Sequence, residues 1–224
     1  MALKFIPDAV AFDCDSTLSS LEGIDELAAL AGVREEVASL TDQAMNGDIP
    51  LEAVYGKRLD LIRPKRADLA HIAREYLATI VPGARETIAA LQARGVAVAI
   101  VSGGLIDAIL PLAHALGIAE ENVFAVPLEF DGNGDYLGLP AHPLATAHGK
   151  AEVIAAWKKR HGFKQVVMVG DGMSDIAARA EGAADAVIGY GGVIVRDAVR
   201  KQADVFVADN DLRALLPLLH GERT

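Results

Sequence analysis

The run Ala9-Val10-Ala11-Phe12 predicts a short buried strand, and it ends directly in Asp13-Cys14-Asp15. Side chains alternate between the two faces of a strand, so Asp13 and Asp15 leave on the same side while Cys14 turns into the protein. Two carboxylates about 5 to 6 Å apart repel each other by about 3 kcal/mol at an effective dielectric of about 20. A divalent cation would relieve this repulsion. Taken alone, the pattern is also compatible with a solvated Asp-rich turn.

A second acidic element repeats this design. The apolar run from Val166 to Val169 leads into Gly170-Asp171-Gly172 and then Asp175. The glycines allow a sharp turn and a close approach to a ligand, and the loop is expected to enter a helix over 176–181. No Cys or His pair at zinc-like spacing lies nearby, so the oxygen ligands predict a hard cation, with Mg²⁺ the usual one at phosphate sites. The four predicted metal ligands are Asp13, Asp15, Asp171 and Asp175.

Two further elements are suited to binding an anion. The apolar run 96–101 ends in Ser102-Gly103-Gly104, which offers a hydroxyl and backbone N–H groups at the start of the next helix. The alternative is an ordinary strand-to-helix turn. Lys150 opens the helical stretch 151–157, where a surface lysine is the default. It is not a Walker lysine, because the preceding residues lack the leading Gly and no Ser or Thr follows.

The chain is organised as a helical segment inside an α/β protein. With 224 residues and 52% hydrophobic composition, it is large enough for an α/β core and a second small domain. Apolar spacing over 19–80 predicts helices only, with breaks at Gly32, Asn46-Gly47 and Arg63-Pro64. After Pro82-Gly83, helices alternate with buried strands over 96–101, 166–169, 186–188 and 205–207. This order predicts a mostly parallel sheet with helices on both faces, whose ligand sites lie at the carboxyl ends of the strands.

The segment Val123 to Leu139 predicts a β-hairpin around Asp131–Asp135. A calcium loop is excluded there, because an EF-hand starting at Asp131 would need Gly at Tyr136 and Glu at His142.

Charge and composition exclude several classes of function. The net charge is −10 and no basic stripe is present, which argues against binding nucleic acid. The longest stretch without a charged residue, 136–149, is too short and too rich in Pro and Gly to cross a membrane. We see no signal peptide, because Asp8 interrupts the N-terminus before an apolar region forms. A single cysteine, Cys14, forms no intrachain disulfide and suggests a reducing cytoplasm; its inward position indicates packing rather than catalysis.

These motifs together resemble those of the haloacid dehalogenase superfamily of phosphohydrolases. The resemblance covers nearly the whole chain and is carried, in order, by Asp13-x-Asp15, Ser102, Lys150 and Gly170-Asp171-Gly172-x-x-Asp175. Within the superfamily, Asp13 to Leu18 and Glu22 to Ala28 look like the N-terminal signature of the phosphoserine phosphatase family. The likeness continues through Thr41 to Gly47, Arg58-Leu59 and Val101 to Gly104.

The resemblance implies a Rossmann-like three-layer core with an inserted helical cap of the C1 type. The expected core is 1–18 with 81–224, and the expected cap is 19–80. It implies an Mg²⁺-dependent phosphatase in which Asp13 attacks phosphorus to give an aspartyl-phosphate. Asp15 would be the general acid and then the base. The metal would be held by the Asp13 carboxylate, the Asp15 backbone carbonyl and Asp171, with Asp175 supporting them. Ser102, the N–H of Gly103 and Lys150 would hold the phosphoryl oxygens, and Gly104 is a further expected substrate-binding residue.

For the substrate, the resemblance implies O-phospho-L-serine, and hence the last step of serine biosynthesis. Glu22 would bind its amino group, Arg58 its carboxylate, and Met45 would line the pocket near the serine backbone. Ser174 stands where this family usually has Asn or Thr, which leaves its contact to phosphate or nucleophile weaker or indirect. No regulatory domain is expected at this length.

Other functions remain open from the sequence. One is a related phosphatase or phosphotransferase acting on phosphothreonine, phosphohomoserine or phosphocholine. Another is a catalytically silent phospho-ligand sensor, although a binder has no need of a nucleophile beside an acid. Halide release needs neither the acid at Asp15 nor a metal. The expected partner in each case is a small phosphomonoester, with no nucleic acid or membrane. Whether the chain forms a homodimer is not decided by the sequence.

Overall fold

The structure, a computed structural model, describes residues 3–45 and 51–220. Its centre is a parallel sheet of six strands in the order β3-β2-β1-β6-β7-β8. Every residue of β1, β6 and β7 is buried, as expected of a sheet covered on both faces. The strands are β1 (Ala9–Phe12), β2 (Ala97–Leu105), β3 (Val123–Val126), β6 (Val166–Gly170), β7 (Ala186–Tyr190) and β8 (Val205–Val207).

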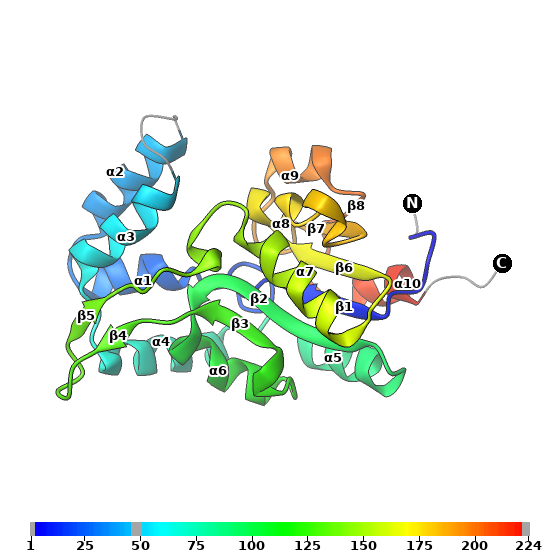
Figure 1. Cartoon of the computed structure of the whole chain (residues 1–224), viewed down its shortest axis with the longest axis horizontal. Coiled ribbons are helices and arrows are strands. Elements are labelled where there is room, and N and C mark those ends of the chain that lie inside the picture. The colour runs from blue at the N-terminus through cyan, green and yellow to red at the C-terminus, as the bar shows by residue number, and fades with distance from the viewer. Residues whose placement is uncertain (1–2, 46–50, 221–224) are drawn as a thin grey trace.

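Helices cover this sheet from both sides, with α5 below and α9 above the strands in Figure 1. Their apolar faces and the strands form one hydrophobic core. The α-helices around the sheet are α5 (Ala84–Ala93), α6 (Ile106–Ala115), α7 (Gly149–His161), α8 (Met173–Ala177), α9 (Asp197–Gln202) and α10 (Leu216–Leu219). Short 3-10 turns lie at Glu120–Asn122, Pro143–Ala145, Ala180–Gly182 and Leu212–Leu215. The α/β fold with a mostly parallel sheet is confirmed.

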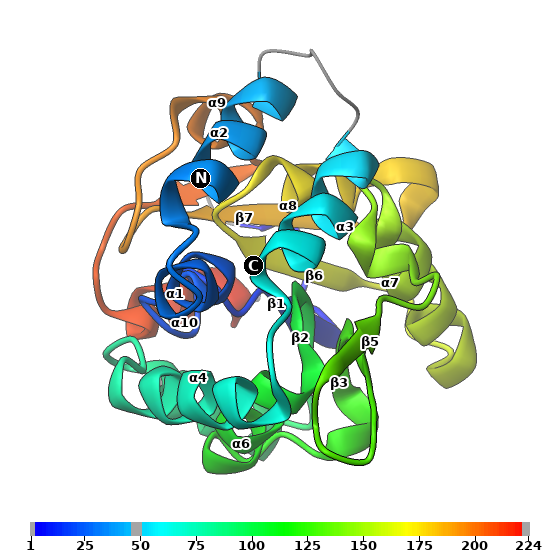
Figure 2. The same cartoon turned by 90° about the vertical axis from the view of Figure 1, so that its left-hand side faces the viewer.

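Among the described residues between β1 and α5, four helices are inserted: α1 (Gly23–Leu30), α2 (Arg34–Met45), α3 (Leu51–Ile62) and α4 (Arg66–Ala78). The first three extend from one end of the sheet, and α4 runs beside α6 (Figures 1 and 2). The chain leaves and re-enters the sheet region side by side, where Ser19 bridges Ile80 and the N–H of Val81 donates to the carbonyl of Leu18 at 2.9 Å. The division into core and cap at these crossings stays a prediction.

The breaks between the inserted helices have local causes. Gly32 has φ +73°, a left-handed conformation that suits glycine. Arg63 has φ +44° just before Pro64, where the helical conformation is disfavoured. The third predicted break, Asn46-Gly47, lies outside the described residues. No helix in the described ranges is both long enough and apolar enough to cross a membrane.

Three local predictions need correction. The hairpin consists of β4 (Glu129–Phe130) and β5 (Tyr136–Gly138) only, because Val123–Val126 pairs with β2 as the edge strand of the main sheet. Strand β2 does not end at Val101 but runs to Leu105, with a register irregularity against β3 between these residues. Helix α8 spans Met173–Ala177 rather than 176–181, because Gly172 already takes the extended backbone of an N-cap and Glu181 has φ +55°.

Gly149→Ala tests the close packing that starts α7. A Cβ atom at Gly149 would overlap the backbone carbonyl of Pro143, so we expect a loss of about 1 to 3 kcal/mol in the free energy of unfolding. The control is Gly138→Ala, where nothing lies within 4 Å of the new atom. The free energy of unfolding of both variants is measured by urea denaturation. Equal values for the two would contradict the close packing of Gly149 against Pro143.

Candidate active site

A cavity of about 390 Å³ opens at the carboxyl ends of β1, β2 and β6, and α1, α3 and α4 contribute to its wall. Nearly all of the residues predicted from the sequence line it. They are Asp13, Asp15, Glu22, Arg58, Ser102, Gly103, Gly104, Lys150, Asp171 and Ser174. Asp175 lies behind the wall and is fully buried, and the side chain of Met45, the last residue of α2, lies outside the described part of the chain.

Strand pairing brings the two acidic motifs together. Strands β1 and β6 are parallel neighbours in which Phe12 pairs with Val169, and the N–H of Asp13 donates to the carbonyl of Val169 at 2.9 Å. Asp13 and Asp171 therefore follow the ends of adjacent strands at one edge of the sheet. This is the edge at which parallel sheets bind ligands.

The ammonium group of Lys150 joins these motifs. Its Nζ lies 2.7 Å from Oδ2 of Asp13 and 2.6 Å from Oδ1 of Asp175. Burial would lower the pKa of Lys150, but the two carboxylates outweigh burial and raise it. Lys150 is therefore a cation held in a fixed place, as an anion-binding role requires.

Three carboxylates form a candidate cation site. Asp13, Asp171 and Asp175 are buried, and one oxygen of each lies within 4.8 Å of the others. Burial and the charge of Asp13 raise the pKa of Asp171, which indicates repulsion that a cation would relieve. An oxygen-only donor set of this kind fits a hard divalent cation.

The carboxyl group of Asp15 has a different environment. Its Oδ1 accepts hydrogen bonds from the hydroxyl of Tyr76 at 2.6 Å and the N–H of Gly23 at 3.0 Å. Burial, followed by the charge of Glu22, raises the pKa of Asp15 to about 7. A carboxyl group that gains and loses a proton near neutral pH is suited to general acid–base catalysis.

Two opposite charges face the cavity beyond these groups. Oε1 of Glu22 accepts from the hydroxyl of Ser16 at 2.6 Å, and burial raises the pKa of Glu22. The Nε atom of Arg58 is buried without a hydrogen-bond partner, and burial lowers the pKa of its guanidinium. A buried, unsatisfied donor on a cationic side chain is costly without a ligand, so Arg58 is a candidate anion-binding group.

The turn Ser102-Gly103-Gly104 lies inside the irregular end of β2 and not at a helix N-terminus, since α6 begins at Ile106. Oγ of Ser102 accepts from the N–H of Gly104 at 3.1 Å, and the carbonyl of Gly103 accepts from the hydroxyl of Tyr55 at 2.6 Å. The turn lines the cavity, and it precedes Leu105, the N-cap of α6, rather than forming the first turn of that helix.

Sequence reasoning missed three cavity residues whose side chains donate hydrogen bonds to predicted site residues: Arg196, Tyr55 and Tyr76. Arg196 donates to Oδ2 of Asp171 at 2.9 Å and lies 3.5 Å from Oε1 of Glu22. It follows β7 without any motif, so nothing local marked it. Tyr76 lies in the apolar helical pattern expected over 19–80 and is only 1% exposed, as a core residue would be. Its second role is visible only in the structure, where its hydroxyl donates to Asp15.

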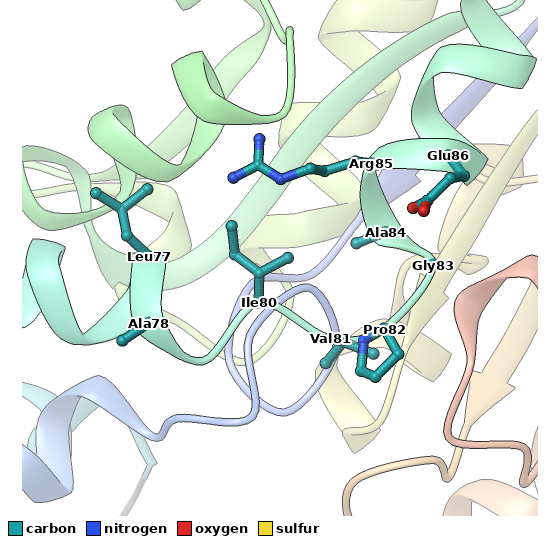
Figure 3. A pocket seen from close by; sticks show the side chains of 9 residues that line it. All are labelled: Leu77, Ala78, Ile80, Val81, Pro82, Gly83, Ala84, Arg85 and Glu86. Atoms are coloured by element: carbon teal, nitrogen blue, oxygen red, sulfur yellow. The ribbon is translucent and has the colours of Figure 1, made fainter.

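A second hollow, of about 290 Å³, lies where α4 leads into α5 and is lined by residues 77, 78 and 80–86. Figure 3 shows the side chain of Arg85 extending across it near Ile80. The guanidinium of Arg85 donates to the backbone carbonyl of Ala115. None of the predicted site residues lines this hollow, so it is separate from the carboxylate cluster.

Comparison with known proteins gives one consistent result. Residues 7–182 match the haloacid dehalogenase-like hydrolase family. The chain is 42% identical over 203 residues to a phosphoserine phosphatase of Bos taurus, with 90% of this chain and 89% of the relative covered.

Two solved structures extend the comparison. One is a phospho-aspartyl intermediate analogue of phosphoserine phosphatase, with TM-score 0.79, 31% identity, and 95% and 99% of the two chains covered. The other is the DsGPDH of Dunaliella salina, with TM-score 0.79 and 35% identity. There the match covers 95% of this chain but only 36% of that longer chain.

The pKa of Asp15 predicts how stability changes with pH in metal-free protein. The unfolded chain releases this proton near pH 3.8, whereas the folded protein retains it up to about pH 7. The free energy of unfolding should therefore fall as pH rises between these values, by up to roughly 4 kcal/mol from this group.

The variant Asp15→Asn isolates this effect, because an amide oxygen still accepts from Tyr76 and Gly23 but cannot ionise. Relative to the wild type, we expect the variant to gain stability steadily as pH rises through the same range. Urea denaturation between about pH 4.5 and pH 8 makes the comparison. Parallel pH profiles for the two proteins would show that Asp15 does not titrate in this range.

Proposed function

This chain belongs to the haloacid dehalogenase-like hydrolase family, and we propose that it hydrolyses O-phospho-L-serine to L-serine and phosphate. It is a phosphoric monoester hydrolase that acts on a small phosphomonoester and depends on a divalent metal. The observation that carries the choice of substrate is the placement of Glu22 and Arg58 in one cavity with Asp13 and Lys150. An anion and a cation beside a phosphate site match the ammonium and carboxylate of a zwitterionic phosphomonoester.

In the proposed reaction, Asp13 is the nucleophile. The N–H of Cys14 donates to its Oδ1 at 2.7 Å and Lys150 holds its Oδ2, so the carboxylate is fixed before substrate arrives. A bond forms between an Asp13 oxygen and phosphorus while the bond from phosphorus to the serine oxygen breaks. Asp15 gives its proton to the departing serine oxygen. It then takes a proton from the water that attacks the aspartyl-phosphate, and phosphate and free Asp13 result.

The phosphoryl oxygens require positive partners. Lys150, the hydroxyl of Ser102 and the N–H of Gly103 are the proposed ones. Mg²⁺ is the proposed metal, held by Asp13, the Asp15 backbone carbonyl and Asp171, and when bound it would neutralise the phosphoryl charge. Asp175 supports this arrangement through Lys150 rather than from the cavity wall.

The remaining substrate groups are assigned to the inserted helices. Glu22 is proposed to bind the ammonium group and Arg58 the carboxylate, with Met45 as a further contact. One more contact, Ser174, would come from α8 beside the sheet. Glu22 immediately precedes α1, and Arg58 lies on α3. The proposed place of action is the cytoplasm, which suits a buried free Cys14.

Phosphate release from L-phosphoserine, phosphoethanolamine and phosphothreonine, with and without Mg²⁺, tests the proposal. Arg58→Ala removes the group assigned to the carboxylate. We therefore expect KM for phosphoserine to rise roughly 10- to 150-fold, as for the loss of a charged hydrogen bond. Phosphoethanolamine has no carboxylate, so its kinetics should change by less than about twofold.

The matched control is Arg74→Ala, an exposed arginine of α4 whose loss should leave both substrates unaffected. If Arg58→Ala impairs both substrates equally, the carboxylate assignment fails. If wild-type protein hydrolyses another phosphomonoester in preference to phosphoserine, the choice of substrate fails.

Metal binding has a readout independent of activity. Mg²⁺ at about 100 times its dissociation constant should raise the melting temperature by roughly 5 to 10 °C, because it binds only the folded carboxylate cluster. Asp171→Asn removes one charge of that cluster and should abolish most of the shift. Asp131→Asn, in the exposed hairpin loop, should retain it. An equal shift in both variants would place the metal elsewhere.

A further inference from the structure

Two hydrogen bonds hold opposite ends of a single peptide group at the edge of the cavity. The carbonyl of Gly103 accepts from the hydroxyl of Tyr55, and the N–H of Gly104 donates to Oγ of Ser102. This carbonyl and this N–H belong to the same planar peptide unit, so they point in opposite directions and turn together. Fixing one end therefore fixes the other.

The peptide has little intrinsic reason to keep this orientation. It is flanked by two glycines, which have no Cβ atom and adopt many backbone conformations at small cost. If the peptide turned over, its carbonyl oxygen would face Ser102 in place of the N–H. The bond from Tyr55 opposes that turn, and it comes from α3, an inserted helix, whereas the peptide belongs to β2 of the sheet.

The orientation decides what Ser102 can do. Because its Oγ accepts from Gly104, its own proton is free to be donated to an anion in the cavity. A turned peptide would present an acceptor that takes this proton for itself. Ser102 is only 1% exposed, so water offers little compensation.

Tyr55 also contacts the group assigned to the substrate carboxylate. The guanidinium carbon of Arg58 lies 5.7 Å from the centroid of the Tyr55 ring, one turn further along α3. Burial raises the pKa of Tyr55, so its hydroxyl keeps the proton that it donates. One side chain thus touches both ends of the proposed substrate site.

We propose that Tyr55 is a positioning residue that holds the Gly103-Gly104 peptide so that Ser102 donates to the phosphoryl group. The geometry of the phosphate site then depends on the position of α3 relative to β2. The proposal rests on the proposed function only through the identity of the substrate. The phosphate site itself can be probed with inorganic phosphate.

Tyr55→Phe removes the hydroxyl but keeps the ring beside Arg58. In protein loaded with Mg²⁺, we expect the dissociation constant of inorganic phosphate, measured by calorimetry, to rise about five- to tenfold. KM for phosphoserine should rise by a similar factor. The matched control is Tyr136→Phe, a tyrosine of the hairpin whose ring also lies beside an arginine, Arg63 at 5.8 Å; phosphate binding should not change there.

A double-variant cycle separates positioning from a general structural role. If Tyr55 acts through Ser102, Tyr55→Phe should change phosphate binding less than about twofold in a Ser102→Ala background. An undiminished effect in that background would overturn the proposal, as would unchanged phosphate binding in Tyr55→Phe alone.

Tyr55→Leu provides a second comparison, because it removes the ring as well. It should impair phosphoserine more than phosphoethanolamine, since only phosphoserine has a carboxylate for Arg58. Equal impairment of the two substrates would contradict the contact with Arg58. If the wild type does not hydrolyse phosphoserine, the proposed function fails, while the ratios of phosphate dissociation constants still decide the role of Tyr55.

Discussion

The structure of the site depends on one buried cation between two buried anions: Lys150 between Asp13 and Asp175. Burying any one of these charges without its partners would cost much free energy. Removing one partner of such a buried set typically lowers the free energy of unfolding by about 3 to 5 kcal/mol. The surrounding backbone is packed to suit it. Gly149 lies so close to Pro143 that no Cβ fits beside Lys150, and a Cβ at Gly170 would overlap the carboxylate of Asp175. The sheet places the proposed nucleophile, Asp13, and these contacts hold it at one position.

A second cation, Arg196, links two sites that have different tasks. It donates to Asp171 of the carboxylate cluster and lies within salt-bridge distance of Glu22, the group assigned to the substrate ammonium. Its bond to Asp171 uses Oδ2 and leaves Oδ1 for ligation. In the part of the chain that the structure describes, five carboxylic groups and three cationic side chains meet around the cavity: Asp13, Asp15, Glu22, Asp171 and Asp175 with Arg58, Lys150 and Arg196. This excess of negative charge suits a divalent cation and explains why a phosphate site can be so acidic.

The sequence predicted the strands and the site residues that follow them, because both depend on local patterns of apolar and polar residues. Apolar runs located the strands, and the residues after them were expected at one edge of the sheet because parallel strands share that edge. The errors arose where tertiary contacts decide the outcome. Val123–Val126 was expected in the hairpin, but it pairs with β2 and forms the edge strand of the main sheet. Arg196, Tyr55 and Tyr76 were missed because their roles depend on single hydrogen bonds across the cavity, which leave no spacing in the sequence.

The inserted helices also act on the chemistry at the sheet. Asp15 follows β1, yet both hydrogen bonds to its Oδ1 come from the insertion: one from Tyr76 on α4 and one from Gly23 at the start of α1. The same helices partly bury this carboxyl group, and Glu22 adds a negative charge nearby. Burial and that charge are the two largest causes that raise the pKa of Asp15. An acid able to protonate a leaving group at neutral pH therefore exists only where these helices cover the strand ends, so substrate recognition and acid catalysis depend on the same packing.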